Sequence, residues 1–189
     1  MEFTCKEIIN KIEVPLDNVF DMDYPDWGAD DRGFLQYKTI KNTNLITTYG
    51  FNNEFTNFEL YIESEDEIED FEQSWQKNLL YEVCRTIPEI EDFEELIEET
   101  HFFVIQLHME GAPYEWSLDN PHGNIGIFIG LKNELINNKD FKNISIKLMR
   151  PAELEYILNN GEASKEKLSK LYYEEEIPTN SSMSRKSVL

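Results

Sequence analysis

The sequence predicts a single α+β domain, built on a mixed, largely antiparallel sheet flanked by helices. Its 189 residues are within the usual size of one domain, and 40% hydrophobic residues can fill one core. Aromatic residues are spread along the chain, unlike in a disordered acidic chain. Strand-like runs come in groups instead of alternating one by one with helices, which favours α+β over a doubly wound fold.

The first part of the chain contains a helix and a loop. Hydrophobic residues at helical spacing predict a short amphipathic helix over residues 2–12, which ends ahead of Pro15. Residues 21–33 are rich in aspartate and contain proline and glycine, so they form a loop. We expect Tyr24 and Trp27 in this loop to fold back on the core.

Three strands are expected next. Residues 34–40 and 45–49 are β-prone runs separated by four polar residues, a pattern typical of a hairpin. Residues 58–63 alternate between apolar and polar side chains and form the third strand. The three strands therefore adjoin in one sheet.

Two helices follow these strands. The first is the strongest helix prediction in the chain, because large apolar residues recur every three or four positions from residue 68 and the pattern ends near residues 85–88. A second helix over about residues 91–100 would bury a few apolar side chains and expose many glutamates. The apolar positions of the first helix are Ile68, Phe71, Trp75, Leu79 and Val83.

The second half of the sheet is expected from three more runs. Residues 101–108 are apolar and β-branched, and residues 124–131 and 144–149 show alternation. A polar excursion over residues 109–123 separates the first two runs.

Two helices are expected to close the domain. Pro151 opens the first at its first turn, and Gly161 ends it. Ser164 is the expected N-cap of the last helix, which runs to about residue 173. The domain is thus expected over residues 1–175, with a frayed polar tail over residues 176–189.

The charge is strongly negative and unevenly distributed. The formal net charge is −21, and residues 54–99 hold 17 acidic residues against only Lys77 and Arg85. Such a surface disfavours binding to nucleic acid or to anionic lipid, so neither is expected as a partner. It favours a basic protein partner, although carboxylates also simply solvate exposed helix faces.

Candidate partner-binding residues follow from this charge and from the aromatic residues in the loops. Acidic residues affect mainly the association rate, whereas buried aromatic anchors hold a complex together. The acidic candidates are Glu65, Asp66, Glu67, Glu69, Asp70, Glu91, Asp92, Glu94 and Glu95. The aromatic candidates, which can equally pack against their own domain, are Tyr24, Trp27, Tyr114 and Trp116.

Catalytic motifs of the common enzyme classes are absent from the sequence, which favours a non-enzymatic protein with no cofactor. The alternative is a metal-dependent enzyme that uses His101, His108 and His122. His101 and His108 are seven residues apart, so on a strand their side chains would face opposite sides. A further alternative is an oligomeric regulatory protein.

The cysteines and the N-terminus indicate a cytoplasmic protein. Cys5 and Cys84 are far apart and lack CxxC spacing, so both are expected to be reduced, and Cys84 is expected to be a buried, inert thiol. The first residues lack the basic start and apolar run of a signal peptide, and no stretch is apolar enough to span a membrane.

Several short blocks resemble the suppressor-of-fused domain. Residues 45–62 read LITTYGFNNEFTNFELYI, which is similar to that family's Thr-Tyr-Gly strand end followed by a Phe-Glu-Leu strand. The helix with Trp75, the Gly-led apolar strand over residues 123–131, and the strand-to-helix step over residues 149–154 occur in the same order as in the family. The resemblance covers about residues 35–160.

The resemblance implies a non-enzymatic protein-binding domain. Compact bacterial members of the family are thought to act as immunity proteins that neutralise toxins from neighbouring cells. Many such toxins attack nucleic acids and are basic, so an acidic surface can cover the same cationic groove. We therefore expect an immunity protein whose partner is a basic toxin domain.

Overall fold

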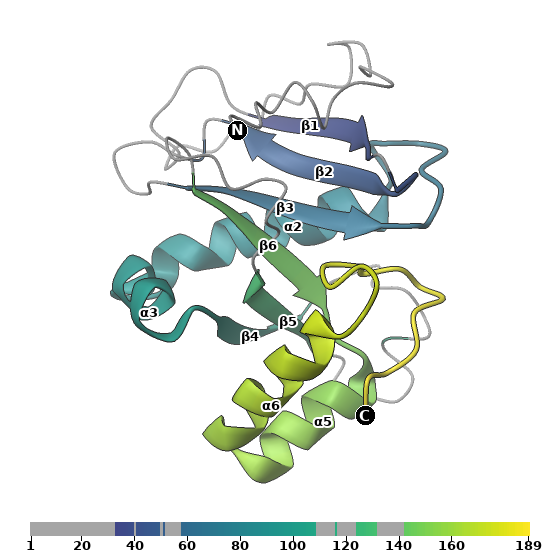
Figure 1. Ribbon diagram of the computed structural model, residues 1–189. Helices are drawn as coiled ribbons and strands as arrows, with labels where there is room; N and C mark the ends of the chain where they lie inside the picture. Colours follow the sequence, from purple (N-terminus) through teal and green to yellow (C-terminus); the bar gives the residue numbers. More distant parts are fainter. Residues whose placement is uncertain are drawn as a thin grey trace, which may run out of the picture.

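A six-stranded mixed sheet, with strand order β1-β2-β3-β6-β5-β4, forms the centre of the computed structural model (Figure 1). The structure describes residues 33–39, 41–49, 51, 58–108, 116, 124–131 and 142–189. Helices cover both faces of the sheet, which confirms the predicted α+β class. The expected helix over residues 2–12, nearly all of the expected loop over residues 21–33, and the excursion over residues 109–123 apart from Trp116 lie outside the described residues.

The first half of the sheet is an antiparallel meander of β1 (Gly33–Lys38), β2 (Asn44–Tyr49) and β3 (Phe58–Ser64). Thr39 and Thr43 close the turn between β1 and β2, because the Thr39 amide donates to the Thr43 carbonyl at 2.9 Å. The predicted hairpin and third strand are confirmed.

The second half is also antiparallel and contains β4 (Phe103–His108), β5 (Asn124–Leu131) and β6 (Lys142–Leu148). The two halves meet where β3 and β6 pair in parallel. Gly130 of β5 is needed where the chain enters β4, because it has φ +107° and a Cβ there would lie 2.5 Å from the His101 carbonyl oxygen.

The helix after β3 is shorter than predicted. α2 spans Trp75–Thr86 and a short 3₁₀ turn, η2, spans Ile87–Glu89. The helix does not begin at Ile68, because residues before it form turns in which the Ser74 hydroxyl donates to the Phe71 carbonyl at 2.8 Å. Ile68 and Phe71 thus contact the core from a turn, which mimics helical spacing in the sequence.

The remaining helices are α3 (Phe93–Thr100), α5 (Pro151–Asn160) and α6 (Glu162–Tyr173). Gly161 separates α5 from α6 with φ +68°. The prediction that Ser164 caps α6 is wrong, because the helix begins at Glu162 and the Ser164 amide donates back to the Gly161 carbonyl at 3.1 Å.

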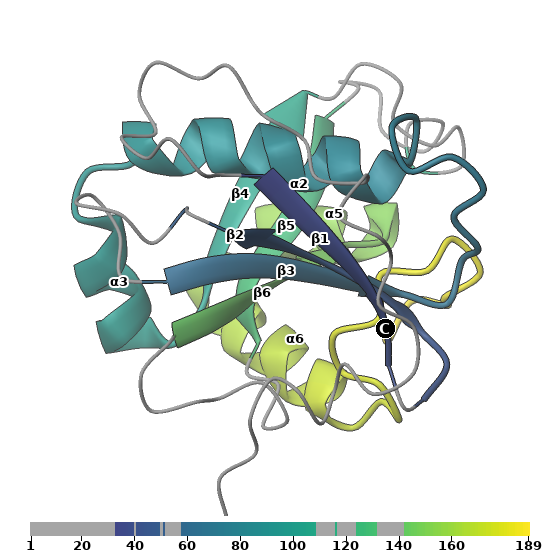
Figure 2. The same ribbon diagram turned by 90° about the horizontal axis from the view of Figure 1, so that it is seen from above.

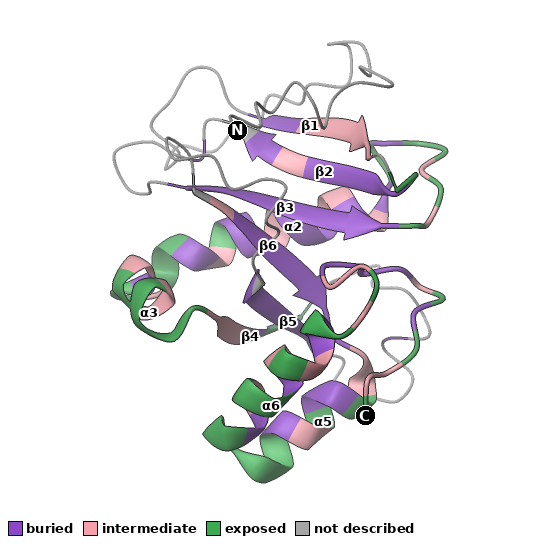
Figure 3. Ribbon diagram, in the orientation of Figure 1, coloured by how far each residue is buried: buried purple, intermediate pink, exposed green. Residues whose placement is uncertain are grey.

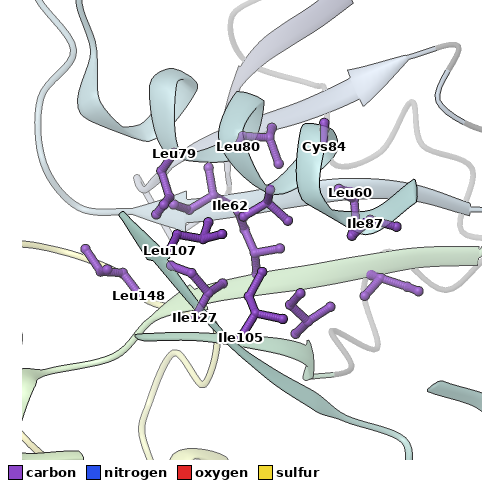
Figure 4. Close-up of a cluster of buried hydrophobic side chains, with 14 of the residues drawn as sticks. Leu60, Ile62, Leu79, Leu80, Cys84, Ile87, Ile105, Leu107, Ile127 and Leu148 are labelled. Carbon is purple, nitrogen blue, oxygen red and sulfur yellow. The ribbon is translucent and has the colours of Figure 1, made fainter. Parts of the chain in front are cut away.

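The main core lies between one face of the sheet and the α2–α3 side (Figure 4). Alternating apolar residues of the strands supply one side of this core, and the buried face of α2 supplies the other. Cys84 belongs to it and is fully buried, and burial raises the pKa of its thiol well above the ordinary value. The thiol is therefore held in its neutral form, as expected.

A second, smaller core lies on the opposite face of the sheet, beneath α5 and α6. Phe128 of β5 packs there against Leu154 of α5 and Tyr172 of α6. β5 and β6 are consequently covered on both faces and are buried along nearly all of their described residues (Figure 3). The packing of α5 and α6 on this face positions the buried ionic cluster described below.

The prediction of a frayed tail over residues 176–189 is wrong. Thr179, Asn180, Ser181, Ser182 and Arg185 are all buried, and the segment runs back along the sheet beside the ends of β3 and β6 (Figure 1). Its polar composition suggested solvent exposure, but each of these side chains finds a hydrogen-bond partner inside the domain.

Candidate functional site

The predicted acidic residues form two groups at opposite ends of α2. The acidic turn, defined as residues 65–70, precedes the helix, and the α3 acidic group, defined as residues 91–95, follows it. Figure 2 shows α2 crossing the molecule between them. A helix of 12 residues is about 18 Å long at 1.5 Å per residue, so the two groups are separated by the length of α2 and do not form one cluster.

Part of the acidic turn is used by the protein itself. The Asp66 carboxylate accepts a hydrogen bond from the Met183 amide at 2.7 Å, and the Glu65 carboxylate accepts one from the Asn180 side chain at 2.8 Å. Both residues therefore fix the C-terminal end of the described chain. They are poor candidates for a partner surface.

The other acidic residues of the acidic turn point to solvent. Glu67, Glu69 and Asp70 are exposed, and the Glu67 carboxylate lies 3.6 Å from the Lys38 ammonium with 79% of its side chain still accessible. An ion pair this exposed holds its partners weakly. These three carboxylates remain accessible to a partner.

The α3 acidic group is more open than the acidic turn. Glu91, Asp92 and Glu95 are exposed and Glu94 is half-buried, while the buried Phe93 anchors the start of the helix in the core. Asp92 has a left-handed backbone, with φ 57°. Acidic residues in the first turn of a helix are favoured by the helix dipole, so this group also stabilises α3.

Basic residues do little to neutralise this side of the molecule. Residues 65–100 contain 14 acidic residues and only Lys77 and Arg85. The Lys77 ammonium donates to the Glu72 carbonyl at 2.8 Å, and Arg85 lies 3.3 Å from Glu82 on its own helix. The α2–α3 side is therefore strongly negative.

One of the predicted aromatic anchors is part of the core. Trp116 is only 1% exposed, its indole N–H donates to the Met183 sulfur at 2.9 Å, and the Arg150 guanidinium lies 4.6 Å from the centre of its ring. Its suggested role as an exposed anchor is thus wrong. Tyr24, Trp27 and Tyr114 lie outside the described residues.

The two described histidines do not meet. His101 follows the last turn of α3 and His108 ends β4, and both are exposed. At about 3.3 Å per strand residue they are roughly 20 Å apart, too far to bind one ion. His122 lies outside the described residues, and no group of three metal-ligating side chains occurs within the part of the chain that the structure describes.

An ionic cluster that local sequence patterns do not predict lies between β6, α5, α6 and residues 178–188, the C-terminal segment. Its members are Lys147, Glu153, Tyr172, Glu175 and Arg185. The side chains of Lys147 and Glu153 have no exposed surface. Buried charges of this kind persist only when paired and hydrogen-bonded.

Glu153 is at the centre of the ionic cluster. Its two carboxylate oxygens accept hydrogen bonds from the Arg185 guanidinium at 2.9 and 2.7 Å, from the Tyr172 hydroxyl at 2.8 Å and from the Arg150 and Val188 amides at 2.7 and 3.0 Å. Burial alone would raise the pKa of Glu153, but the hydrogen bonds and charge of Arg185 hold it below the usual range. Glu153 is therefore ionised throughout the neutral range.

Lys147 is the second buried charge. Its ammonium donates to the Glu175 carboxylate at 2.8 Å and to the Pro178 and Asn180 carbonyls at 2.7 Å each. Burial and repulsion by Arg185 lower its pKa to about 8, although Glu175 partly compensates. The three donors of the ammonium group are thus all satisfied, two of them by the backbone of the C-terminal segment.

The sequence did carry a weak signal for this cluster. Lys147 and Ser145 occupy the polar positions of an alternating strand, which look solvent-exposed when the strand is considered alone. Because β6 is central in the sheet and covered on both faces, those polar positions must find partners inside the protein. The burial of these polar positions follows from the strand order, which local sequence patterns do not predict.

The fold and surface define the class of the protein as a mixed-sheet α+β domain with one strongly acidic side and a buried ionic cluster. Comparisons with protein-family models, with curated proteins and with solved structures gave no match. None of the described helices is both long and apolar enough to cross a membrane.

Proposed function

We propose that this chain is a non-enzymatic, cytoplasmic protein-binding domain that neutralises a basic toxin, as an immunity protein does. The observation that carries the proposal is the accumulation of exposed carboxylates in residues 65–100, a stretch whose two basic residues, Lys77 and Arg85, already contact its own oxygen atoms. The resemblance to the suppressor-of-fused domain supports the immunity role. A basic groove that binds nucleic acid in the toxin is the matching surface.

The α3 acidic group and the exposed residues of the acidic turn are the contact candidates. A single-sign surface speeds association by attracting the partner before contact. The helix between the two groups is only about 18 Å long, and a standard protein interface, which buries about 800 Å² on each partner, can span both of its ends. We therefore expect both groups to contribute to the association rate.

The test uses matched charge changes on different sides of the molecule. The first variant carries Glu91→Gln, Asp92→Asn and Glu95→Gln, and the control carries Glu155→Gln, Glu166→Gln and Glu174→Gln on exposed positions of the α5–α6 side. The partner to be tested is a basic protein encoded by a neighbouring gene, and its association is measured by biolayer interferometry at low salt. We expect the first variant to associate on the order of tenfold more slowly than the control.

Two outcomes would contradict the proposal. Equal slowing in both variants would mean that net charge alone governs the interaction, with no defined acidic surface. No binding of the neighbouring basic protein, together with no protection of cells that express it, would remove the immunity role.

A further inference from the structure

The two halves of the sheet separate at the carboxyl ends of β3 and β6. Within the described residues, β3 and β6 form the one parallel pairing, and it runs from Phe58 opposite Lys142 to Ile62 opposite Ile146. Beyond these residues the two strands no longer pair with each other. In open α/β sheets, the crevice outside the carboxyl ends of strands at a change in strand order is a common binding place.

Here the crevice is filled by the C-terminal segment. Asn180 forms a parallel bridge with Glu63, and the Ser181 amide donates to the Glu63 carbonyl at 2.8 Å. On the other side, the Leu148 amide donates to the Ser181 hydroxyl at 3.0 Å. Ser181 thus lies between the ends of β3 and β6, as a bound strand would.

The segment turns on both sides of its bridge to β3, since the Asn180 amide donates to the Ile177 carbonyl and the Arg185 amide to the Ser182 carbonyl, at 3.0 Å each. Several of its contacts with the domain are nevertheless made through its backbone. Lys147 binds two of its carbonyls, the Asp66 carboxylate accepts from the Met183 amide, and the Glu153 carboxylate accepts from the Val188 amide. Backbone contacts give affinity with little demand on sequence, whereas pockets for particular side chains give specificity.

Two side-chain sites supply that specificity. The Glu63 carboxylate accepts from the hydroxyls of Thr43 and Thr179, so one site selects a small hydroxyl side chain. The deeper site is Glu153, which binds the Arg185 guanidinium with both oxygens, while the Leu148 carbonyl accepts from the same guanidinium at 3.0 Å. Such bidentate recognition is specific to arginine.

We propose that the crevice between the carboxyl ends of β3 and β6 is a binding site for a short, arginine-bearing peptide segment that turns just ahead of its arginine, and that the C-terminal segment occupies this site in the free protein. The ligand has a small hydroxyl residue that pairs beside Glu63 and an arginine that reaches Glu153. This site goes beyond the proposed function, which requires only the exposed acidic residues of the α2–α3 side.

The experiment tests whether a separate peptide can take the place of the C-terminal segment. The probe is a fluorescently labelled synthetic peptide of residues 177–189, added to the full chain and followed by fluorescence anisotropy. The protein variant Arg185→Gln weakens the attachment of the C-terminal segment to Glu153. Lys186→Gln is the matched control, because it removes the same charge at a neighbouring exposed position. A second peptide has glutamine in place of its arginine.

We expect the arginine peptide to bind the Arg185→Gln variant at least tenfold more tightly than the wild-type protein or the Lys186→Gln variant. The intact segment competes with an effective concentration in the millimolar range, so it excludes the peptide from those two proteins. The glutamine peptide should lose at least tenfold in affinity for the Arg185→Gln variant. Equally weak binding to all three proteins would overturn the proposal.

Native-state hydrogen exchange of the wild-type protein keeps the test decisive if the Arg185→Gln variant does not fold. A displaceable segment opens without the core, so its amides should exchange before those of β3 and β6. If residues 178–188 exchange only together with those strands, the segment is an inseparable part of the core and the proposal fails. Neither measurement depends on a toxin. A negative result would therefore contradict the peptide site without bearing on the proposed function.

Discussion

Glu153 shows what one buried charge demands of its surroundings. It is fully buried and its two oxygens accept five hydrogen bonds, two of them from the Arg185 guanidinium. Replacing such a pair with apolar residues is often neutral, but removing one partner leaves an uncompensated buried charge. The burial of the Arg185 guanidinium therefore depends on the Glu153 carboxylate.

The variant Glu153→Gln should lower the free energy of unfolding by about 3 kcal/mol, because the buried Arg185 would lose its bidentate carboxylate and keep only Glu175, 4.0 Å away, as a counter-charge. Urea unfolding at neutral pH measures this loss. Glu155→Gln, an exposed change on the same helix, is the control and should stay within about 0.5 kcal/mol of the wild type. A similar small effect for Glu153→Gln would show that the C-terminal segment does not contribute to stability.

Lys147 predicts a stability that rises with pH. Its folded pKa is about 8, below the ordinary 10.5, so between these values the unfolded chain binds more protons than the folded protein. The free energy of unfolding therefore increases with pH in this window. Charging Lys147 below pH 8 costs stability, even though the ammonium is fully hydrogen-bonded.

The comparison of wild-type protein with Lys147→Met isolates this effect, because the other titrating groups are common to both. Urea unfolding from pH 8 upward should show the wild type gaining stability relative to the variant up to about pH 10.5. Burial raises the pKa of Tyr172 well above the ordinary value, so its hydroxyl stays protonated in the folded protein through most of this window. A constant difference across the window would mean that Lys147 titrates normally.

At the scale of single elements, α2 depends on one capping residue. The Ser74 hydroxyl accepts from the Lys77 amide at 3.4 Å and donates to the Phe71 carbonyl at 2.8 Å, so it links the turn to the start of the helix. This contact sets the first residue of α2.

The variant Ser74→Ala should therefore destabilise the protein by about 1 kcal/mol, the usual cost of losing an N-cap. Thermal unfolding followed by circular dichroism measures it. Ser169→Ala is the matched control, because Ser169 lies inside α6, where alanine is the better helix former, and a slight gain is expected. A loss of equal size in both variants would contradict the capping role.

The elements differ in how well their sequence predicts them. β5 was predicted to the residue, because alternation and flanking polar segments mark both of its ends. α2 was predicted to begin seven residues too early, since Ile68 and Phe71 reach the core from a turn at helix-like spacing. The C-terminal segment was missed, because its burial depends on a crevice formed by distant strands.

The candidate site was predictable to a similar extent. Local composition was enough to identify the exposed carboxylates around α2 and α3, but it did not show that Glu65 and Asp66 bind the protein's own C-terminal segment. The ionic cluster was missed because its members come from four separate parts of the chain. Only the tertiary structure brings Lys147, Glu153 and Arg185 together.

At the scale of the whole molecule, the net charge of −21 should make stability depend on salt. Like charges repel one another in the compact state, and added salt screens exposed charges more than buried pairs. The midpoint of urea unfolding should therefore rise as sodium chloride increases from about 0.05 M to about 0.5 M. A variant with Glu67, Glu69, Glu91 and Glu95 changed to Gln should show a smaller rise, and an equal rise would contradict the role of surface repulsion.

The parallel pairing of β3 with β6 has a consequence for folding kinetics. Each half of the sheet is a meander whose neighbouring strands follow one another along the chain, so each half has low contact order. The pairing of Ile62 with Ile146 instead closes a long loop, whose entropy is lost before any contact compensates for it. We expect this docking of two preformed meanders to limit the folding rate, with Arg185 reaching Glu153 only after the barrier has been crossed.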